Sequence, residues 1–135
     1  AREKAYSQNK PILIDFTGWA CVNCRRVEEN IWSNPEVYDI LKSSFIISSL
    51  YVDDRKKLSS EESFSFKFPD GRIKKIRTIG EKWSTFQLQN FNSASQPYYI
   101  IIHPNGRILN YPIQYTSSVN KYRNWLNKGL DNYGL

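Results

Sequence analysis

The chain lacks methionine and has only one histidine, two cysteines, six glycines and six prolines among its 135 residues. Two cysteines are too few for a small protein built on disulfides, and together with a single histidine they argue against a mononuclear four-ligand zinc site. The longest apolar stretches, residues 45–52 and 98–102, are far shorter than the roughly 20 residues that cross a bilayer. The sequence therefore argues against a disulfide scaffold, a structural zinc site and a transmembrane helix.

Apolar residues make up 40% of the chain and aromatic residues 15%, which is enough for an ordinary hydrophobic core. We expect a single domain over residues 1–135. The net charge of +6 bears on solubility and partner choice rather than on fold. Because no leader of basic and then apolar residues precedes the domain, we expect a processed chain or an excised domain.

The two cysteines form the motif Cys21-Val22-Asn23-Cys24. Two cysteines placed at random would have this spacing in only about 1.5% of cases, so the spacing calls for a chemical reason. The apolar, β-branched run at 11–16 predicts a buried strand that ends at Thr17 and Gly18. Cys24, Val27 and Ile31 then share one face of a predicted helix. The motif is therefore expected at a strand-to-helix turn.

The remaining elements follow from apolar periodicity, turn residues and helix caps. They are a helix starting at Asn34 and Pro35, a strand at 45–52, a hairpin of 64–68 and 72–77, a helix at 81–91, strands at 98–102 and 107–110, and a helix at 118–128 capped by Gly129. This order predicts an α/β fold in which a central mixed sheet carries helices on both faces. Strands covered on both faces should be apolar on both sides.

The position of each cysteine suggests its role in redox chemistry. Cys21 lies at the helix start, where unpaired N–H groups and the helix dipole stabilise a thiolate, so it is the predicted nucleophile. Cys24 faces the core and is the predicted resolving thiol, which attacks the mixed disulfide on Cys21. A static disulfide or two inert thiols are the alternative.

Asp15 interrupts the apolar strand six positions before Cys21. Burial raises the pKa of a carboxyl group, so Asp15 is a candidate acceptor for the Cys24 proton. A hydrogen-bonded strand-end aspartate without a role in proton transfer is the alternative interpretation.

These residues carry a family resemblance. The run 12–16 followed by Trp19-Ala20-Cys21-Val22-Asn23-Cys24 resembles the thioredoxin superfamily, in which a buried Asp stands six before the first cysteine. The runs 24–29, 32–37 and 50–54 look most like the C-terminal thioredoxin-like domain of DsbD-type thiol:disulfide interchange proteins. Within that family they most resemble the Bacteroidetes members. The chain departs from thioredoxins where Ala20 separates Trp19 from Cys21 and where Val22-Asn23 replaces the usual proline-containing pair.

The resemblance implies a thioredoxin-like fold with an insertion of a hairpin and a helix at about 53–96. Gln96-Pro97 stands where the family has its cis-proline loop, so the resemblance assigns substrate binding to Trp19, Ala20, Gln96 and Pro97. It also implies reduction of protein disulfides outside the cytoplasm, in the periplasm for this family, with no cofactor beyond the Cys21–Cys24 disulfide. The implied partners are disulfide-bonded or thiol proteins, including those of cytochrome c biogenesis, and a membrane-embedded electron donor domain. The isolated domain is expected to be a monomer.

Two other functions fit the cysteine motif. One is a metal-binding or metal-chaperone module that holds Cu(I) or Zn(II) through Cys21 and Cys24, and the other is a non-catalytic adaptor with the same fold. We assign no metal ligands, because the metal function leaves Asp15 and Pro97 unexplained.

Basic residues gather in two places, Arg25 and Arg26 beside the cysteines and a group on the predicted hairpin. The hairpin group consists of Lys67, Arg72, Lys74, Lys75 and Arg77. We interpret Arg25 and Arg26 as solvated helix charges, and the hairpin group as the lysine-rich edge of a soluble sheet rather than a nucleic-acid site.

Overall fold

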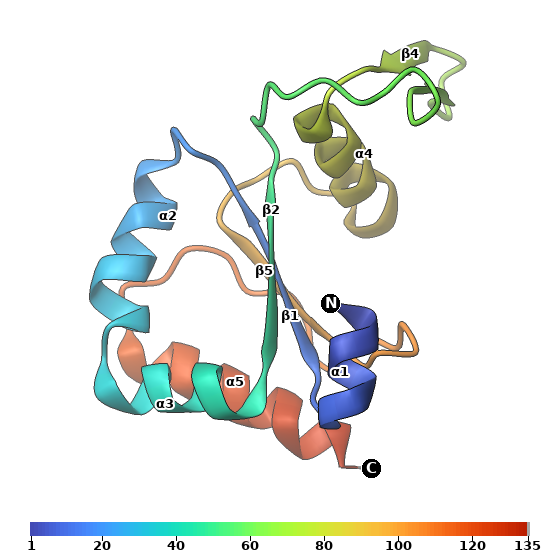
Figure 1. Ribbon diagram of the computed structural model, residues 1–135. Helices are drawn as coiled ribbons and strands as arrows, with labels where there is room; N and C mark the ends of the chain where they lie inside the picture. The colour runs from blue at the N-terminus through green and yellow to red at the C-terminus, as the bar shows by residue number, and fades with distance from the viewer. Residues whose placement is uncertain (135) are drawn as a thin grey trace.

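The computed structural model describes residues 1–134 and has a three-stranded mixed sheet at its centre (Figure 1). Its strands are β1 (Ile12–Thr17), β2 (Ile46–Tyr51) and β5 (Tyr98–Ile102), in the spatial order β2-β1-β5. β1 runs parallel to β2 and antiparallel to β5. The mixed sheet predicted from the sequence is thereby confirmed.

The crossover from β1 to β2 begins with α2 (Val22–Val27) and a π-helical turn, η1 (Glu28–Trp32). It continues through α3 (Pro35–Ser44), whose first turn is capped by the Asn34 side chain. The Oδ1 atom of Asn34 accepts N–H groups of the first turn at 3.0 and 3.4 Å. Asn34 and Pro35 therefore start this helix as predicted.

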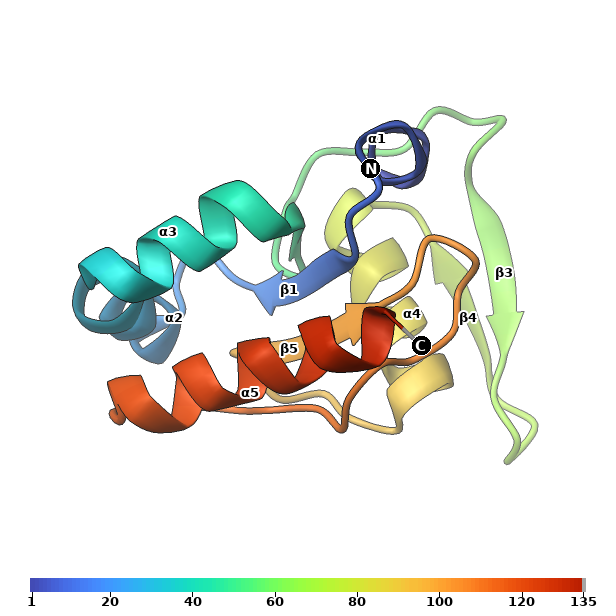
Figure 2. The ribbon, with the colours of Figure 1, turned by 90° about the horizontal axis from the view of Figure 1, so that it is seen from below.

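Helices cover both faces of the sheet (Figure 2). On one face α2, η1, α3 and α5 (Val119–Tyr133) enclose a core that includes Leu13, Tyr99 and Ile101 from the strands. On the other face α1 (Arg2–Gln8) and α4 (Ile79–Phe91) pack against Ile14, Phe16 and Ile100. Because successive strand residues point to opposite faces, Asp15 lies on the α2 side, between Leu13 and Thr17.

A two-stranded hairpin, β3 (Phe64–Lys67) and β4 (Ile73–Ile76), extends away from the central sheet (Figures 1 and 2). The segment before β3 is joined to the segment after β4, because the Leu58 N–H donates to the Arg77 carbonyl at 2.8 Å. Helix α4 follows with Thr78 as its N-cap. The predicted hairpin and the predicted helix are both present.

Two expectations about the C-terminal part of the chain were wrong in detail. Residues 107–110 form no strand, because this segment touches β5 only through the isolated bridge of Ile102 with Ile108, and a further bridge pairs Tyr99 with Ile113. Helix α5 continues to Tyr133, so Gly129 lies inside it and is not its cap. A Cβ atom at Gly129 would clash with Cδ1 of the buried Ile101, so this glycine allows close packing on the sheet.

Strand β2 is only partly buried, although burial on both faces was expected. It is an edge strand, with Ile46 buried and Ile47 exposed. No helix within residues 1–134 has the length and apolar character needed to cross a membrane.

Candidate functional site

Cys21 and Cys24 are joined by a disulfide at the start of α2, with Cα atoms 5.2 Å apart. Cys21 is the N-cap of the helix, and its sulfur accepts the N–H of Cys24 at 3.2 Å. Cys21 is partly exposed, whereas only 1% of Cys24 is accessible. An incoming substrate can therefore reach the Cys21 sulfur, while Cys24 is held in the core beneath it.

Asp15 is 3% exposed and lies on the sheet face that α2 covers. Burial raises its pKa to about 6, and the hydrogen bond that Ser49 donates to Oδ2 at 3.0 Å offsets only part of this effect. The negative charge of Glu28 adds to the increase and the positive charge of Arg25 opposes it. Oδ1 of Asp15 is buried and has no partner within residues 1–134, so an oxygen is available to receive a proton.

Arg25 differs from its sequence-based interpretation as a solvated helix charge. Its Nη2 donates to Thr17 Oγ1 at 3.0 Å and to Glu28 Oε2 at 2.8 Å, so the guanidinium ties α2 to the end of β1. The Nε atom of Arg25 is buried without a partner in the described chain. Glu28 and Arg25 therefore place one negative and one positive charge near Asp15. We define the buried Asp15 and the partly exposed Arg25 and Glu28 as the Asp15 charge group.

The residues just before Cys21 are fixed by Asp53, which follows β2. Its carboxylate accepts the N–H of Trp19 at 2.9 Å and the N–H of Ala20 at 3.1 Å. Partial desolvation raises the pKa of Asp53, but these hydrogen bonds outweigh it and the pKa is lowered. Asp53 therefore stays ionised and holds the approach to Cys21 in one conformation.

Trp19 is 63% exposed and stacks on Tyr51, with ring centroids 3.9 Å apart and planes 16° apart. The exposed Val22 lies on the other side of Cys21 in the sequence. Trp19 and Val22 are thus exposed apolar side chains within two residues of Cys21, which suits contact with a polypeptide substrate.

The peptide bond between Gln96 and Pro97 is cis, as the resemblance implied. In the antiparallel register Tyr98 pairs with Phe16, so Pro97 lies at the same end of the sheet as the cysteine motif. Gln87 of α4 is fully buried and holds this loop, since its Nε2 donates to the Ser95 carbonyl at 2.8 Å and its Oε1 accepts Gln96 Nε2 at 2.9 Å. Helix α4 thus supports the cis-proline loop directly.

Cys21 and Cys24 lie at the start of α2, and Asp15 lies on the face of β1 that α2 covers. Gln96 and Pro97 lie at the same end of the sheet as the two cysteines. Sequence reasoning missed Glu28, Asp53 and Gln87. Glu28 follows Cys24 by four residues on the same helical stretch, so periodicity could have found it. Asp53 and Gln87 act through contacts with segments that no local pattern connects to them.

No group of three or more His, Cys, Asp and Glu side chains suited to hold a metal ion occurs in residues 1–134. A family model described as thioredoxin-like matches residues 1–69. The chain belongs to the thioredoxin-like family. No curated protein sequence gives a significant match.

Solved structures with the same fold include two named enzymes. A DsbH oxidoreductase has a TM-score of 0.62 and 19% identity, with 94% of this chain and 79% of that chain covered. A disulphide isomerase from Xylella fastidiosa Temecula1 has a TM-score of 0.54 and 11% identity, with 99% and 83% covered. A thioredoxin-fold protein from Helicobacter pylori has a TM-score of 0.63 and 18% identity, with 93% and 72% covered. At these identities the likeness establishes the fold.

Proposed function

We propose that this protein is a thiol–disulfide oxidoreductase that reduces disulfides in proteins outside the cytoplasm. The observation that carries the proposal is the Cys21–Cys24 disulfide at a helix start, with one partly exposed and one buried sulfur. This arrangement supplies an accessible nucleophile and a resolving thiol three residues away. The names of two proteins that share the fold, an oxidoreductase and a disulphide isomerase, support the same class of reaction.

In the proposed cycle, the reduced Cys21 thiolate attacks one sulfur of a substrate disulfide. A bond forms between Cys21 and that sulfur, and the other substrate sulfur leaves as a thiolate. Cys24, after losing its proton to Asp15 or to a water held by Asp15, then attacks the Cys21 sulfur. The second substrate sulfur leaves, and the Cys21–Cys24 disulfide closes. Two electrons have passed from the protein to the substrate.

The remaining residues of the site position the reactants in this cycle. The family's cis-proline loop pairs with a substrate backbone as an added strand, and Gln96 precedes the cis bond here. Trp19, stacked on Tyr51, is an exposed aromatic side chain two residues before Cys21, while Asp53 fixes Trp19 and Ala20 through their N–H groups. We assign the substrate-binding role to Trp19, Ala20, Gln96 and Pro97 on this basis.

The proposal also concerns the proteins that give electrons to this domain and receive electrons from it. Following the resemblance to DsbD-type C-terminal domains, a membrane-embedded donor domain would reduce Cys21–Cys24, and periplasmic thiol proteins would receive the electrons. A reductant needs a reduction potential near thioredoxin's, about −270 mV, or in the −200s. Equilibration of the purified protein with glutathione measures this potential, and a value near about −120 mV would overturn the assignment as a reductant.

Insulin reduction tests the activity itself. We expect the parent to catalyse the dithiothreitol-driven precipitation of insulin and the Cys21→Ser variant to lose this catalysis. A variant as active as the parent would refute the redox function, and stoichiometric Cu(I) or Zn(II) retained through purification would favour the metal-binding alternative.

A further inference from the structure

The positive charge of the chain is concentrated in one segment. Residues 55–82 hold nine of the 19 basic residues and four of the 13 acidic ones, which gives +5 of the total +6. The remainder of the chain is close to neutral. This segment contains the hairpin, the strands β3 and β4, and the first turn of α4. The charge is therefore a property of one surface, and that surface can attract a partner of opposite sign.

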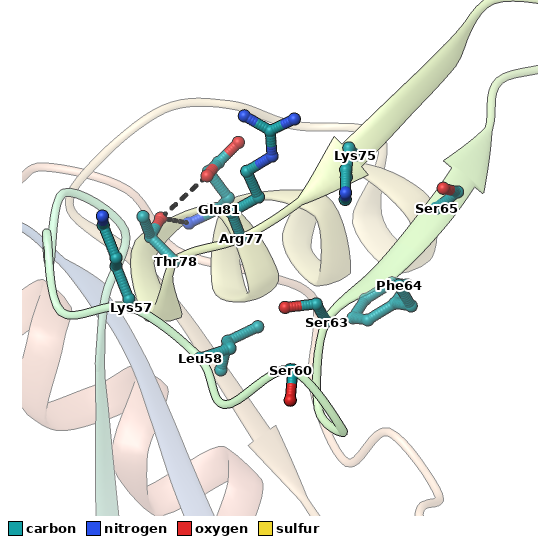
Figure 3. A pocket seen from close by; sticks show the side chains of 10 residues that line it. All are labelled: Lys57, Leu58, Ser60, Ser63, Phe64, Ser65, Lys75, Arg77, Thr78 and Glu81. Carbon is teal, nitrogen blue, oxygen red and sulfur yellow. Dashed lines mark hydrogen bonds between the residues drawn. The ribbon is translucent and has the colours of Figure 1, made fainter.

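A pocket of about 630 Å³ opens within this segment, between residues 57–65, strand β4 and the start of α4 (Figure 3). We call this cavity the hairpin pocket. Its lining combines cations, hydroxyl groups and apolar side chains. The lining residues are Lys57, Leu58, Ser60, Ser63, Phe64, Ser65, Lys75, Arg77, Thr78 and Glu81.

The cations of the hairpin pocket have no side-chain partners in the part of the chain that the structure describes. Lys57, Lys75 and Arg77 make no ion pair and no side-chain hydrogen bond within residues 1–134. The one carboxylate of the lining, Glu81, accepts the Thr78 hydroxyl at 3.1 Å and lies 3.9 Å from the Lys74 ammonium. The pocket therefore presents three free positive charges against one negative charge that is already compensated.

The hairpin pocket is connected to the redox site by a short stretch of chain. Asp53 accepts the N–H groups of Trp19 and Ala20, next to Cys21. Lys57 follows Asp53 by four residues, which span at most about 14 Å. The segment between them is pinned to the start of α4, because the N–H of Gly80 donates to the Asp54 carbonyl at 2.9 Å. A polypeptide bound at Cys21 can therefore reach the pocket with a few more residues.

We propose that the hairpin pocket binds an acidic, extended segment of the protein whose disulfide is exchanged at Cys21. This proposal rests on the proposed function, because it concerns the substrate of that same site. Carboxylates of the segment pair with Lys57, Lys75 and Arg77, serine hydroxyls donate further hydrogen bonds, and Leu58 and Phe64 receive an apolar side chain. The apolar Leu58 and Phe64 in the lining and the short path to Cys21 favour a polypeptide over a nucleic acid on this surface.

Charges at the rim of a binding site act mainly on the rate of encounter, and salt weakens them. We therefore expect acidic substrates to have an advantage of about tenfold in kcat/KM at low ionic strength. The advantage should shrink toward unity when the salt concentration is raised to near 1 M, because the screening length then falls to about 3 Å.

Two disulfide peptides test the proposal directly. Both carry the same cystine-bridged part, and one ends in four glutamates while the other ends in four glutamines. Reduction of each is compared for the parent, for Lys57→Gln/Lys75→Gln/Arg77→Gln, and for the control Lys4→Gln/Lys42→Gln/Lys128→Gln, which loses the same charge from exposed helix positions. We expect the preference for the glutamate tail in the parent and the control, and its loss in the hairpin variant. Equal preference in all three proteins, or an absence of preference in the parent, would overturn the proposal.

A binding measurement separates failure of this proposal from failure of the redox function. Fluorescence anisotropy follows a labelled, cysteine-free tetraglutamate peptide on the Cys21→Ser/Cys24→Ser protein, with and without the three hairpin substitutions. We expect binding that the hairpin substitutions weaken by about tenfold, whether or not the parent reduces any disulfide. Binding that they leave unchanged would refute the site. Displacement of the peptide by a DNA oligonucleotide at a lower concentration than by unlabelled peptide would assign the surface to nucleic acid instead.

Discussion

The charged side chains of this protein form two groups that are built in opposite ways. In the Asp15 charge group, Asp15 is buried on the sheet face that α2 covers, and the charges of Glu28 and Arg25 shift its pKa in opposite directions. In the hairpin pocket, Lys57, Lys75 and Arg77 are exposed and have no partner in the described chain. A buried charge changes pKa values and thus the chemical step, whereas an exposed charge acts on the approach of a partner.

Replacing Asp15 by Asn should have the largest effect on the rate. If Asp15 accepts the Cys24 proton, its carboxylate must be ionised, so the rate of resolution should rise with pH through about 6 and then level off. Asp15→Asn should lower this rate about 10- to 100-fold and remove the inflection. Stopped-flow release of the second thiol, measured from pH 4 to 8, checks both. An unchanged inflection would show that another group titrates.

The same substitution should stabilise the oxidised protein at neutral pH. The pKa of Asp15 is raised from 3.8 to about 6 by folding, so between these values the folded chain binds more protons than the unfolded chain. The free energy of unfolding therefore falls as pH rises from 4 to 6, by roughly 2–3 kcal/mol from this group. Asp15→Asn avoids this cost and should exceed the parent in stability at pH 8 but not at pH 3. Urea denaturation at the two pH values measures the difference.

Gln87 is a buried, uncharged side chain that holds the cis-proline loop through hydrogen bonds to Ser95 and Gln96. Leucine at this position would leave the Ser95 carbonyl and the Gln96 amide without their partner, at a cost of about 1–3 kcal/mol in unfolding free energy. Because Gln96 precedes the cis bond, Gln87→Leu should also raise KM for a peptide disulfide several-fold while leaving kcat nearly unchanged. Gln87→Glu, which keeps the acceptor for Gln96, should recover part of the KM. If both variants changed kcat and KM to the same extent, the result would point to a loss of folded protein alone.

The smallest stability change is expected in the hairpin pocket. Replacing Lys57, Lys75 and Arg77 by Gln should alter the free energy of unfolding by about 0.5 kcal/mol or less, because exposed and unpaired charges contribute little. Thermal unfolding of the variant beside the parent measures this. A loss comparable to that of Gln87→Leu would show that these cations stabilise the fold and would remove the contrast between the two charge groups.

Local patterns were sufficient for the elements of residues 11–44. The strand, the cysteine motif at the helix start, and the cap at Asn34 each depend on neighbours within a few residues, and all are present. The burial of Asp15 followed from its place in an apolar strand. Helix α1 was missed because Ala5 is its only buried residue, so the segment has no apolar stripe to detect.

Other features depend on contacts between distant segments. Gly129 resembles a cap in the sequence, yet it lies inside α5 because Ile101 of the sheet packs against it. The hydrogen bonds of Asp53 and Gln87 join segments that only the fold brings together. The basic residues of 55–82 were visible in the sequence, but the pocket they line is formed by the hairpin and α4 jointly. These features therefore depend on tertiary packing, which local propensity alone does not predict.

The proposed exchange at Cys21 is tested most directly by trapping its intermediate. The reduced Cys24→Ser protein is mixed with a peptide disulfide, and the intact mass and a proteolytic map are recorded. We expect a stable adduct of one half of the peptide on Cys21, because no resolving thiol is present to release it. The matched Cys21→Ser protein, whose remaining thiol is buried, should form no adduct at the same time and pH. An adduct on Cys24 of Cys21→Ser, or none in either variant, would contradict the assignment of Cys21 as the nucleophile.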